Sequence, residues 1–231
     1  MEPLRVTFTF TAPMMRHSEH PLHLDALVAW CVSEDAISAG STDPWGDAGD
    51  LSYALDRAEA ENGEWVWKAS ALVFKPLRER ELTTMIRRSD VVDYAHAYAS
   101  KIIESRVTPA SVNTRSGHLR AYQYMMPYQW MSSATAWCIG EREVLADLLP
   151  RLPGIGKQTR NGYGQIASID VTVDEVAQRN WMRRVMPRQL ADKAPFLYVP
   201  TQFPLRAPYW KKTERVLAME PVEQEFLMNE A

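Results

Sequence analysis

A glycine-rich run from Gly154 to Gly164 limits the folds that this chain can adopt. The run holds four of the ten glycines in a chain of 231 residues. Because glycine accepts positive φ and lets another backbone come close, such a run is typical of a tight loop. Pro150 and Pro153 end a helical pattern just before the run, and a period-two pattern begins at its end. The sequence therefore predicts a helix, a glycine-rich loop and a strand, in that order.

Hydrophobic periodicity predicts the other elements of the core. The expected elements, in chain order, are a strand at 4–11, a helix at 21–30 with Pro21 in its first turn, strands at 64–74 and 133–139, a helix at 141–149 and a strand at 164–173. The acidic segment 33–62 predicts a loop with one short helix. This order of elements is the split βαβ arrangement of a ferredoxin-like fold, in the α+β class.

Two segments fall outside that arrangement. Residues from about 78 to 120 lose clear periodicity and gather arginines, which predicts a basic, thumb-like insertion between the second and third core strands. Residues 175–231 contain six prolines and several bases, which predicts an extended C-terminal tail that packs on the core or on partner subunits. Residues 1–174 would then form one ferredoxin-like domain that carries the insertion.

The distribution of charge favours a nucleic-acid partner more than the net charge of −3 does. Residues 1–64 hold 12 acidic and 3 basic residues, whereas residues 65–231 hold 17 acidic and 23 basic residues. The larger part of the chain is therefore basic, as a phosphate-binding surface requires.

The sequence also bears on the compartment of the protein. Cys31 and Cys138 lie in apolar runs, which predicts that their thiols are buried. No basic stretch followed by an apolar core opens the sequence and no apolar run is long enough for a membrane span, so we expect a cytoplasmic protein without a membrane partner.

The glycine-rich loop carries side chains that bind anions. Its amides could line one concavity, Lys157 and Arg160 add positive charge, and three neighbouring polar residues add hydrogen-bond donors. A P-loop and a dinucleotide-binding loop both need a strand before the loop and a helix after it, which is the reverse of the order here. A tight connection that uses glycine for geometry alone remains the alternative, although it does not account for the two cations.

The loop and its context resemble a known family. The sequence Gly154-Ile-Gly-Lys-Gln-Thr-Arg-Asn-Gly-Tyr-Gly164, the opening helix at 20–30 and the segment Trp137–Glu141 are similar to the RAMP superfamily of CRISPR-associated RNA-binding proteins. The closest resemblance is to the small subunit that caps the five-prime end of the guide RNA in type IV CRISPR complexes. The resemblance is good over residues 1–32 and 130–173, weak over the insertion, and not evident in the tail.

The resemblance implies a noncatalytic subunit that grips the five-prime handle of the crRNA. Its partners would be the backbone subunit and the large subunit of the same complex and, through the assembled complex, target DNA; no cofactor and no metal is expected. The RNA-binding residues in the loop would be Gly154, Gly156, Lys157, Gln158, Thr159, Arg160, Asn161, Gly162, Tyr163 and Gly164. Those in the insertion would be Arg87, Arg88, Arg106, Arg115, His118 and Arg120.

Two other functions remain open from the sequence. His17, His20 and His23 form a cluster after the first strand, where a repeat-processing endoribonuclease of the RAMP superfamily could hold a general acid or base. The spacing of these histidines also suits a metal, but no cysteine or carboxylate pair supports a zinc site. A structural assembly module, which meets its neighbours through segment 34–64 and the tail, is the remaining alternative.

Overall fold

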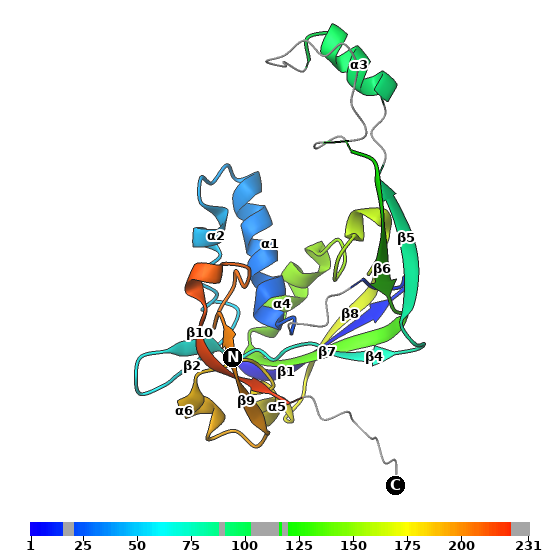
Figure 1. Cartoon of the computed structure of the whole chain (residues 1–231). Helices are drawn as coiled ribbons and strands as arrows, with labels where there is room; N and C mark the ends of the chain where they lie inside the picture. Colours follow the sequence, from blue (N-terminus) through cyan, green and yellow to red (C-terminus); the bar gives the residue numbers. More distant parts are fainter. Residues whose placement is uncertain (16–20, 88–90, 103–115, 117–119, 223–231) are drawn as a thin grey trace. The chain divides into compact units, whose positions relative to one another are not determined.

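The computed structural model describes residues 1–15, 21–87, 91–102, 116 and 120–222 (Figure 1). It is a mixed α/β structure with antiparallel sheets, compatible with the predicted α+β class. The chain divides into two compact units. The first comprises Met1–Arg78 and Trp130–Ala231, and the second comprises Glu79–Gln129.

A four-stranded antiparallel sheet forms the centre of the first unit. Its strands are β1 (Glu2–Phe10), β4 (Val73–Pro76), β7 (Met131–Gly140) and β8 (Ile166–Val173). They lie in the order β4-β7-β1-β8. Strand β1 is central, and its alternate residues Leu4, Val6 and Phe8 are fully buried. The predicted strands at 4–11, 133–139 and 164–173 are thereby confirmed, and the period-two pattern of β1 buries one of its faces.

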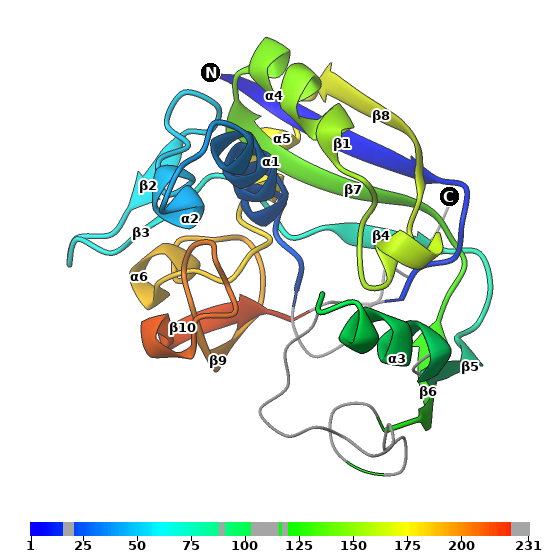
Figure 2. The ribbon, with the colours of Figure 1, turned by 90° about the horizontal axis from the view of Figure 1, so that it is seen from above.

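Two helices pack on the same face of this sheet (Figure 2). Helix α4 (Arg142–Leu148) confirms the helix predicted before the glycine-rich run. Helix α1 (Leu24–Ser38) begins later and ends later than predicted. Pro21 lies outside it, because the residues before Leu24 are extended: the Leu72 N–H donates to the Leu22 carbonyl, and the Leu24 N–H donates to the Ser70 carbonyl.

The prediction of one strand at 64–74 is wrong, because this segment forms two separate strands. Strand β3 (Trp65–Trp67) pairs with β2 (Arg57–Glu59) in a separate hairpin, and only β4 joins the central sheet. The predicted acidic loop accordingly contains the end of α1, helix α2 (Pro44–Asp47) and β2. A segment rich in apolar residues does not reveal which strand each of its halves will pair with, because that pairing depends on contacts far apart in the sequence.

The C-terminal tail has its own elements and is not simply extended. It contains the short helices α5 (Ala177–Asn180) and α6 (Arg188–Ala191), and the strands β9 (Tyr198–Phe203) and β10 (Val216–Pro221) pair in an antiparallel hairpin. Its apolar residues form a second core cluster, to which the central strand β7 contributes Ile139. The tail is thus part of the packed first unit.

The second unit contains the strands β5 (Glu81–Arg87) and β6 (Tyr122–Tyr128) and the helix α3 (Val91–Ala99). The two strands pair along their full length in an antiparallel hairpin. This unit runs further toward the C-terminus than the insertion predicted at about 78–120, because β6 pairs with β5 and not with the central sheet. Within the described part of the chain, no helix is long and apolar enough to cross a membrane.

Candidate nucleic-acid interface

The glycine-rich loop is held against the segment that follows β1. The Lys157 N–H donates to the Met15 carbonyl at 2.6 Å, and the Gly164 N–H donates to the Pro13 carbonyl at 2.8 Å. The two ends of the loop are also joined, because the Ile155 N–H donates to the Gly164 carbonyl at 2.9 Å. The loop therefore has a fixed backbone before any ligand binds, which lowers the entropy cost of binding.

Two glycines make this close backbone contact possible. Gly164 has a φ of +64°, and a Cβ added there would lie 1.9 Å from the Ile155 carbonyl oxygen. Gly156 has a φ of +101°, and its Cβ would lie 2.6 Å from the Met15 carbonyl oxygen. No side chain fits at these distances, so glycine is required by both φ and space.

The tip of the loop is a short 3₁₀ turn, Thr159–Asn161, which begins after a residue in the left-handed conformation. That residue is Gln158, with a φ of 60°. Its carbonyl accepts from the Asn161 N–H at 2.8 Å, and its side-chain oxygen accepts from the Asn161 Nδ2 at 2.8 Å. A non-glycine residue with positive φ is uncommon and is kept only where its surroundings fix it.

Several amides of the loop are hydrogen-bonded within the protein. The N–H groups of six of its residues donate to carbonyls of the protein itself: Ile155, Lys157, Asn161, Gly162, Tyr163 and Gly164. The loop also presents exposed polar side chains. Lys157, Arg160 and Asn161 are exposed, while Gln158, Thr159 and Tyr163 are partly buried. Two cations and a set of polar side chains at one loop suit a phosphodiester backbone.

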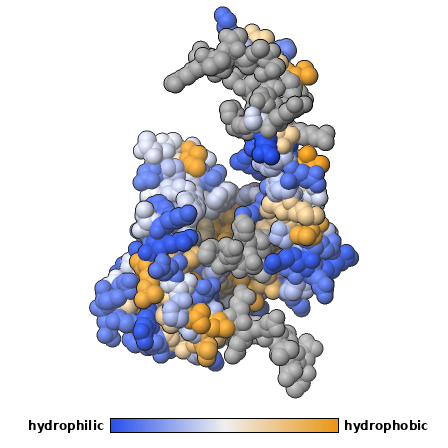
Figure 3. Space-filling view, in the orientation of Figure 1, coloured by the Kyte–Doolittle hydropathy of each residue, from blue (hydrophilic) through white to orange (hydrophobic). Residues whose placement is uncertain are grey.

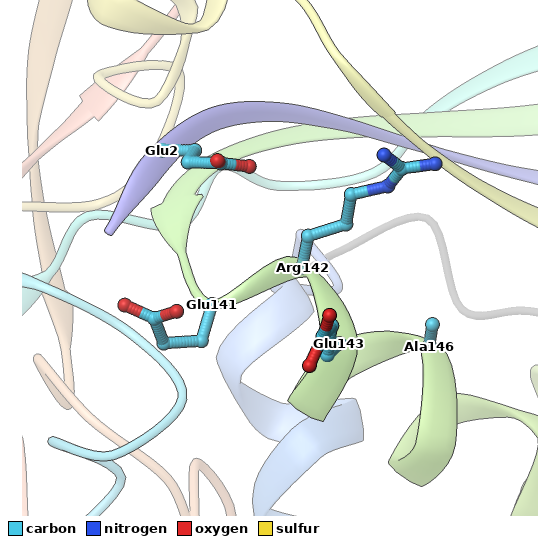
Figure 4. A pocket seen from close by; sticks show the side chains of 5 residues that line it. All are labelled: Glu2, Glu141, Arg142, Glu143 and Ala146. Atoms are coloured by element: carbon cyan, nitrogen blue, oxygen red, sulfur yellow. The ribbon is translucent and has the colours of Figure 1, made fainter.

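A surface cavity of the first unit is negatively charged, in contrast to the basic glycine-rich loop. It has a volume of about 530 Å³ and is lined by Glu2, Glu141, Arg142, Glu143 and Ala146 (Figure 4). Figure 4 shows the guanidinium of Arg142 directed away from Glu141 and Glu143, and its Nε donates to the Val171 carbonyl at 3.2 Å. Three carboxylates with one arginine repel phosphate, so this cavity does not extend the interface.

Two of the predicted RNA-binding residues of the insertion lie in the described part of the second unit. Arg87 and Arg120 are exposed there. The Arg87 guanidinium lies 5.7 Å from the ring centroid of Tyr122 and donates to its hydroxyl at 3.4 Å. Arg88, Arg106, Arg115 and His118 lie outside the described residues.

Sequence reasoning misses the tyrosines of β6. Tyr122, Tyr124 and Tyr128 alternate on one strand, and Arg87 lies over the first of them. The period-two spacing of Tyr122 and Tyr124 is a signal for a shared face. Because the segment leads into the strand predicted at 133–139, its pattern indicates a core element, and its aromatic residues do not stand out as ligand contacts.

Sequence reasoning also misses a buried ionic cluster, which joins the tail to helix α1. Arg184 and Asp25 are both fully buried, 3.6 Å apart. Arg184 donates to the carbonyls of Trp67, Ala69, Val185 and Leu205 and to the Tyr209 hydroxyl, and that hydroxyl donates to Asp25 at 2.7 Å. Burial raises the pKa of Asp25, while the Arg184 charge and the Tyr209 hydroxyl oppose that rise. These contacts satisfy the arginine inside the protein, so the cluster is structural.

His23 is the one residue of the predicted histidine cluster that the structure describes. It is fully buried and stacks on Tyr209, and its Nε2 accepts from the Val185 N–H at 3.1 Å. Burial, together with the nearby Arg184 charge, holds the pKa of His23 well below its usual range. A neutral, buried ring with Nε2 occupied does not reach a scissile phosphate. His17 and His20 lie outside the described residues.

The described residues contain no group of three or more histidine, cysteine, aspartate or glutamate side chains that could hold a metal ion.

The fold and the loop together define the class of this protein: a mixed α/β protein with antiparallel sheets and an exposed, basic, glycine-rich loop. The chain matches the family described as CRISPR type IV associated protein Csf3 over residues 2–221, and it belongs to that family. It is therefore a type IV CRISPR-associated component. No curated protein matches the chain.

Proposed function

We propose that this chain is a noncatalytic RNA-binding subunit of a type IV CRISPR complex, which grips the five-prime handle of the crRNA and caps the backbone filament. The observation that carries the proposal is the glycine-rich loop. Its backbone is fixed by hydrogen bonds to Pro13 and Met15, while Lys157 and Arg160 remain exposed. A rigid loop with two exposed cations binds RNA through its phosphates and sugars, with little ordering on binding.

The strand order supports a ferredoxin-like RAMP fold for the first unit. A ferredoxin-like βαββαβ unit places its first and third strands in the centre of an antiparallel sheet. Here β1 and β7 are central, α1 follows β1, and α4 connects β7 to β8. The glycine-rich loop joins α4 to β8, in the position expected from the resemblance to the RAMP superfamily.

Membership in a type IV CRISPR-associated family implies that this chain works with other subunits. We propose that these are a backbone subunit and a large subunit, and that target DNA is reached only through the assembled complex. The acidic stretch Glu34–Asp56, which contains no lysine or arginine, is a poor surface for RNA and suits contact with a protein.

Replacing Lys157 and Arg160 together with alanine is expected to weaken binding of a labelled repeat RNA. The slope of log Kd against log salt concentration should become shallower by about 0.7 for each phosphate of a single strand that the variant no longer neutralises. Fluorescence anisotropy over a series of salt concentrations measures both quantities. The matched control replaces two exposed bases of the tail, Arg188 and Lys193, with alanine.

The control variant should keep the salt dependence of the wild type. It also removes two positive charges, but these lie far from the loop in the sequence. An unchanged slope in the loop variant would count against RNA binding through Lys157 and Arg160. Equal losses in the loop variant and the control would indicate a general effect of charge, and an assembly module with little RNA contact would then fit better.

The same RNA is expected to remain intact when it is incubated with the purified chain in the absence of divalent metal. His23, the described histidine of the predicted cluster, is fully buried, and a general acid or base must reach the reacting phosphate. Gel analysis of the labelled RNA tests this. Cleavage at one site that disappears in His17→Ala would instead establish the endoribonuclease alternative.

A further inference from the structure

The β5–β6 hairpin of the second unit has two different faces. Cross-strand pairing places Thr83 opposite Met126, Met85 opposite Tyr124 and Arg87 opposite Tyr122. Paired residues of an antiparallel ladder share a face, and the pairs repeat every second residue. One face, which we call the tyrosine face, therefore carries Tyr122, Tyr124, Tyr128 and Arg87. The opposite face carries exposed Leu82, Ile86 and Met125.

The tyrosine face is organised as a row of rings. The ring centroids of Tyr122 and Tyr124 are 5.6 Å apart with an interplanar angle of 37°. The Arg87 guanidinium lies against Tyr122 as well, 5.7 Å from its centroid. At the far end, the Tyr128 hydroxyl donates to the Glu81 carboxylate. Tyr122 is 43% exposed, so its ring is open to a ligand.

This arrangement fits unpaired bases better than it fits a folded protein partner. Aromatic side chains at alternate positions of a strand, with an adjacent arginine, form the stacking platforms of single-strand-binding proteins. Stacking needs accessible rings and tolerates any base. The Arg87 guanidinium attracts RNA phosphates and can also stack on bases. Seen from the side of Figure 1, the surface of the hairpin carries both hydrophilic and hydrophobic residues (Figure 3).

We propose that the tyrosine face of the β5–β6 hairpin stacks unpaired bases of single-stranded RNA, with Tyr122 and Tyr124 as the stacking residues and Arg87 as their cationic neighbour. This inference rests on the proposed function and adds a second kind of contact to it. The glycine-rich loop would hold phosphates and sugars, while the hairpin would hold bases. Neither contact requires a defined sequence of the RNA.

The test replaces Tyr122 with leucine, which keeps an apolar side chain and removes the ring, and with phenylalanine, which keeps the ring and removes the hydroxyl. We expect Tyr122→Leu to weaken binding of the full-length chain to a single-stranded repeat RNA by roughly 5- to 150-fold, the effect of removing the stacking of one base. Tyr122→Phe should bind like the wild type. Met125→Ala, on the opposite face and 66% exposed in the wild type, is the matched control.

The same RNA made with abasic nucleotides separates stacking from phosphate contact. Wild type and Tyr122→Leu should bind the abasic RNA equally, while Lys157→Ala with Arg160→Ala should weaken binding to both RNAs. If the wild type binds RNA and Tyr122→Leu does not differ from it, or if Met125→Ala causes the larger loss, the base-stacking inference is wrong and the proposed function stands. A wild-type chain that binds neither RNA would overturn both.

Discussion

The variant Arg184→Met should lose about 3–5 kcal/mol in the free energy of unfolding, since it leaves the buried Asp25 carboxylate without its cation. Arg184 is fully buried and donates hydrogen bonds to four backbone carbonyls and to Tyr209. Methionine fills a similar volume but satisfies none of these acceptors. Urea denaturation followed by tryptophan fluorescence measures the loss as a shift in midpoint at constant slope.

Two further variants test the cause of that loss. Arg188→Met removes an arginine that is 81% exposed and 3.9 Å from Asp192, so it should cost at most about 1 kcal/mol. The double variant Arg184→Met with Asp25→Leu removes both buried charges and should regain part of the stability lost in Arg184→Met. If the double variant is no more stable than Arg184→Met, the unpaired carboxylate is not the main cost.

The cluster also explains why the tail could not be predicted from the sequence. Its prolines and bases indicate an extended, solvated segment, and local patterns hold no sign that Arg184 reaches Asp25, far away in the chain. Burial of this arginine depends on acceptors that only the folded first unit brings together. Tyr209 contributes another such contact, because its hydroxyl donates to Asp25.

The central sheet, in contrast, could be predicted well from local patterns. Leu4, Val6 and Phe8 alternate with polar residues, and this alternation defines both the strand and its buried face. The hairpin of β2 and β3 is harder to predict, although the sequence between the two strands contains a turn signal. Asn62-Gly63 lies between the two strands, and an Asn-Gly pair favours a turn. Its acidic surroundings conceal it in a segment whose composition predicts a loop.

The position of the glycine-rich loop can be predicted from the sequence, whereas the hydrogen bonds of its amides cannot. Glycine content correctly located a tight loop between α4 and β8, with Lys157 and Arg160 exposed. The partners of its amides do not follow from the sequence, because the sequence does not show that residues 13–15 lie alongside the loop and accept the N–H groups of Lys157 and Gly164. Gly156 and Gly164 allow close packing of two backbone segments, and the side chains of Lys157 and Arg160 remain exposed.

The close packing of the loop backbone predicts that Gly164→Ala lowers the free energy of unfolding strongly. A Cβ at Gly164 would lie 1.9 Å from the Ile155 carbonyl oxygen, and the φ of +64° is itself unfavourable for alanine. The positive φ costs alanine about 1–2 kcal/mol. Displacing the Ile155 backbone costs a similar or larger amount, so the free energy of unfolding should fall by roughly 2–5 kcal/mol in total. Gly63→Ala isolates the first cost, because Gly63 has a φ of +83° with nothing within 4 Å of the added Cβ. Urea denaturation should therefore place Gly164→Ala well below Gly63→Ala in stability, and RNA anisotropy should show weaker binding for Gly164→Ala alone. Equal stability of the two variants would mean that the contact between Ile155 and Gly164 does not fix the loop.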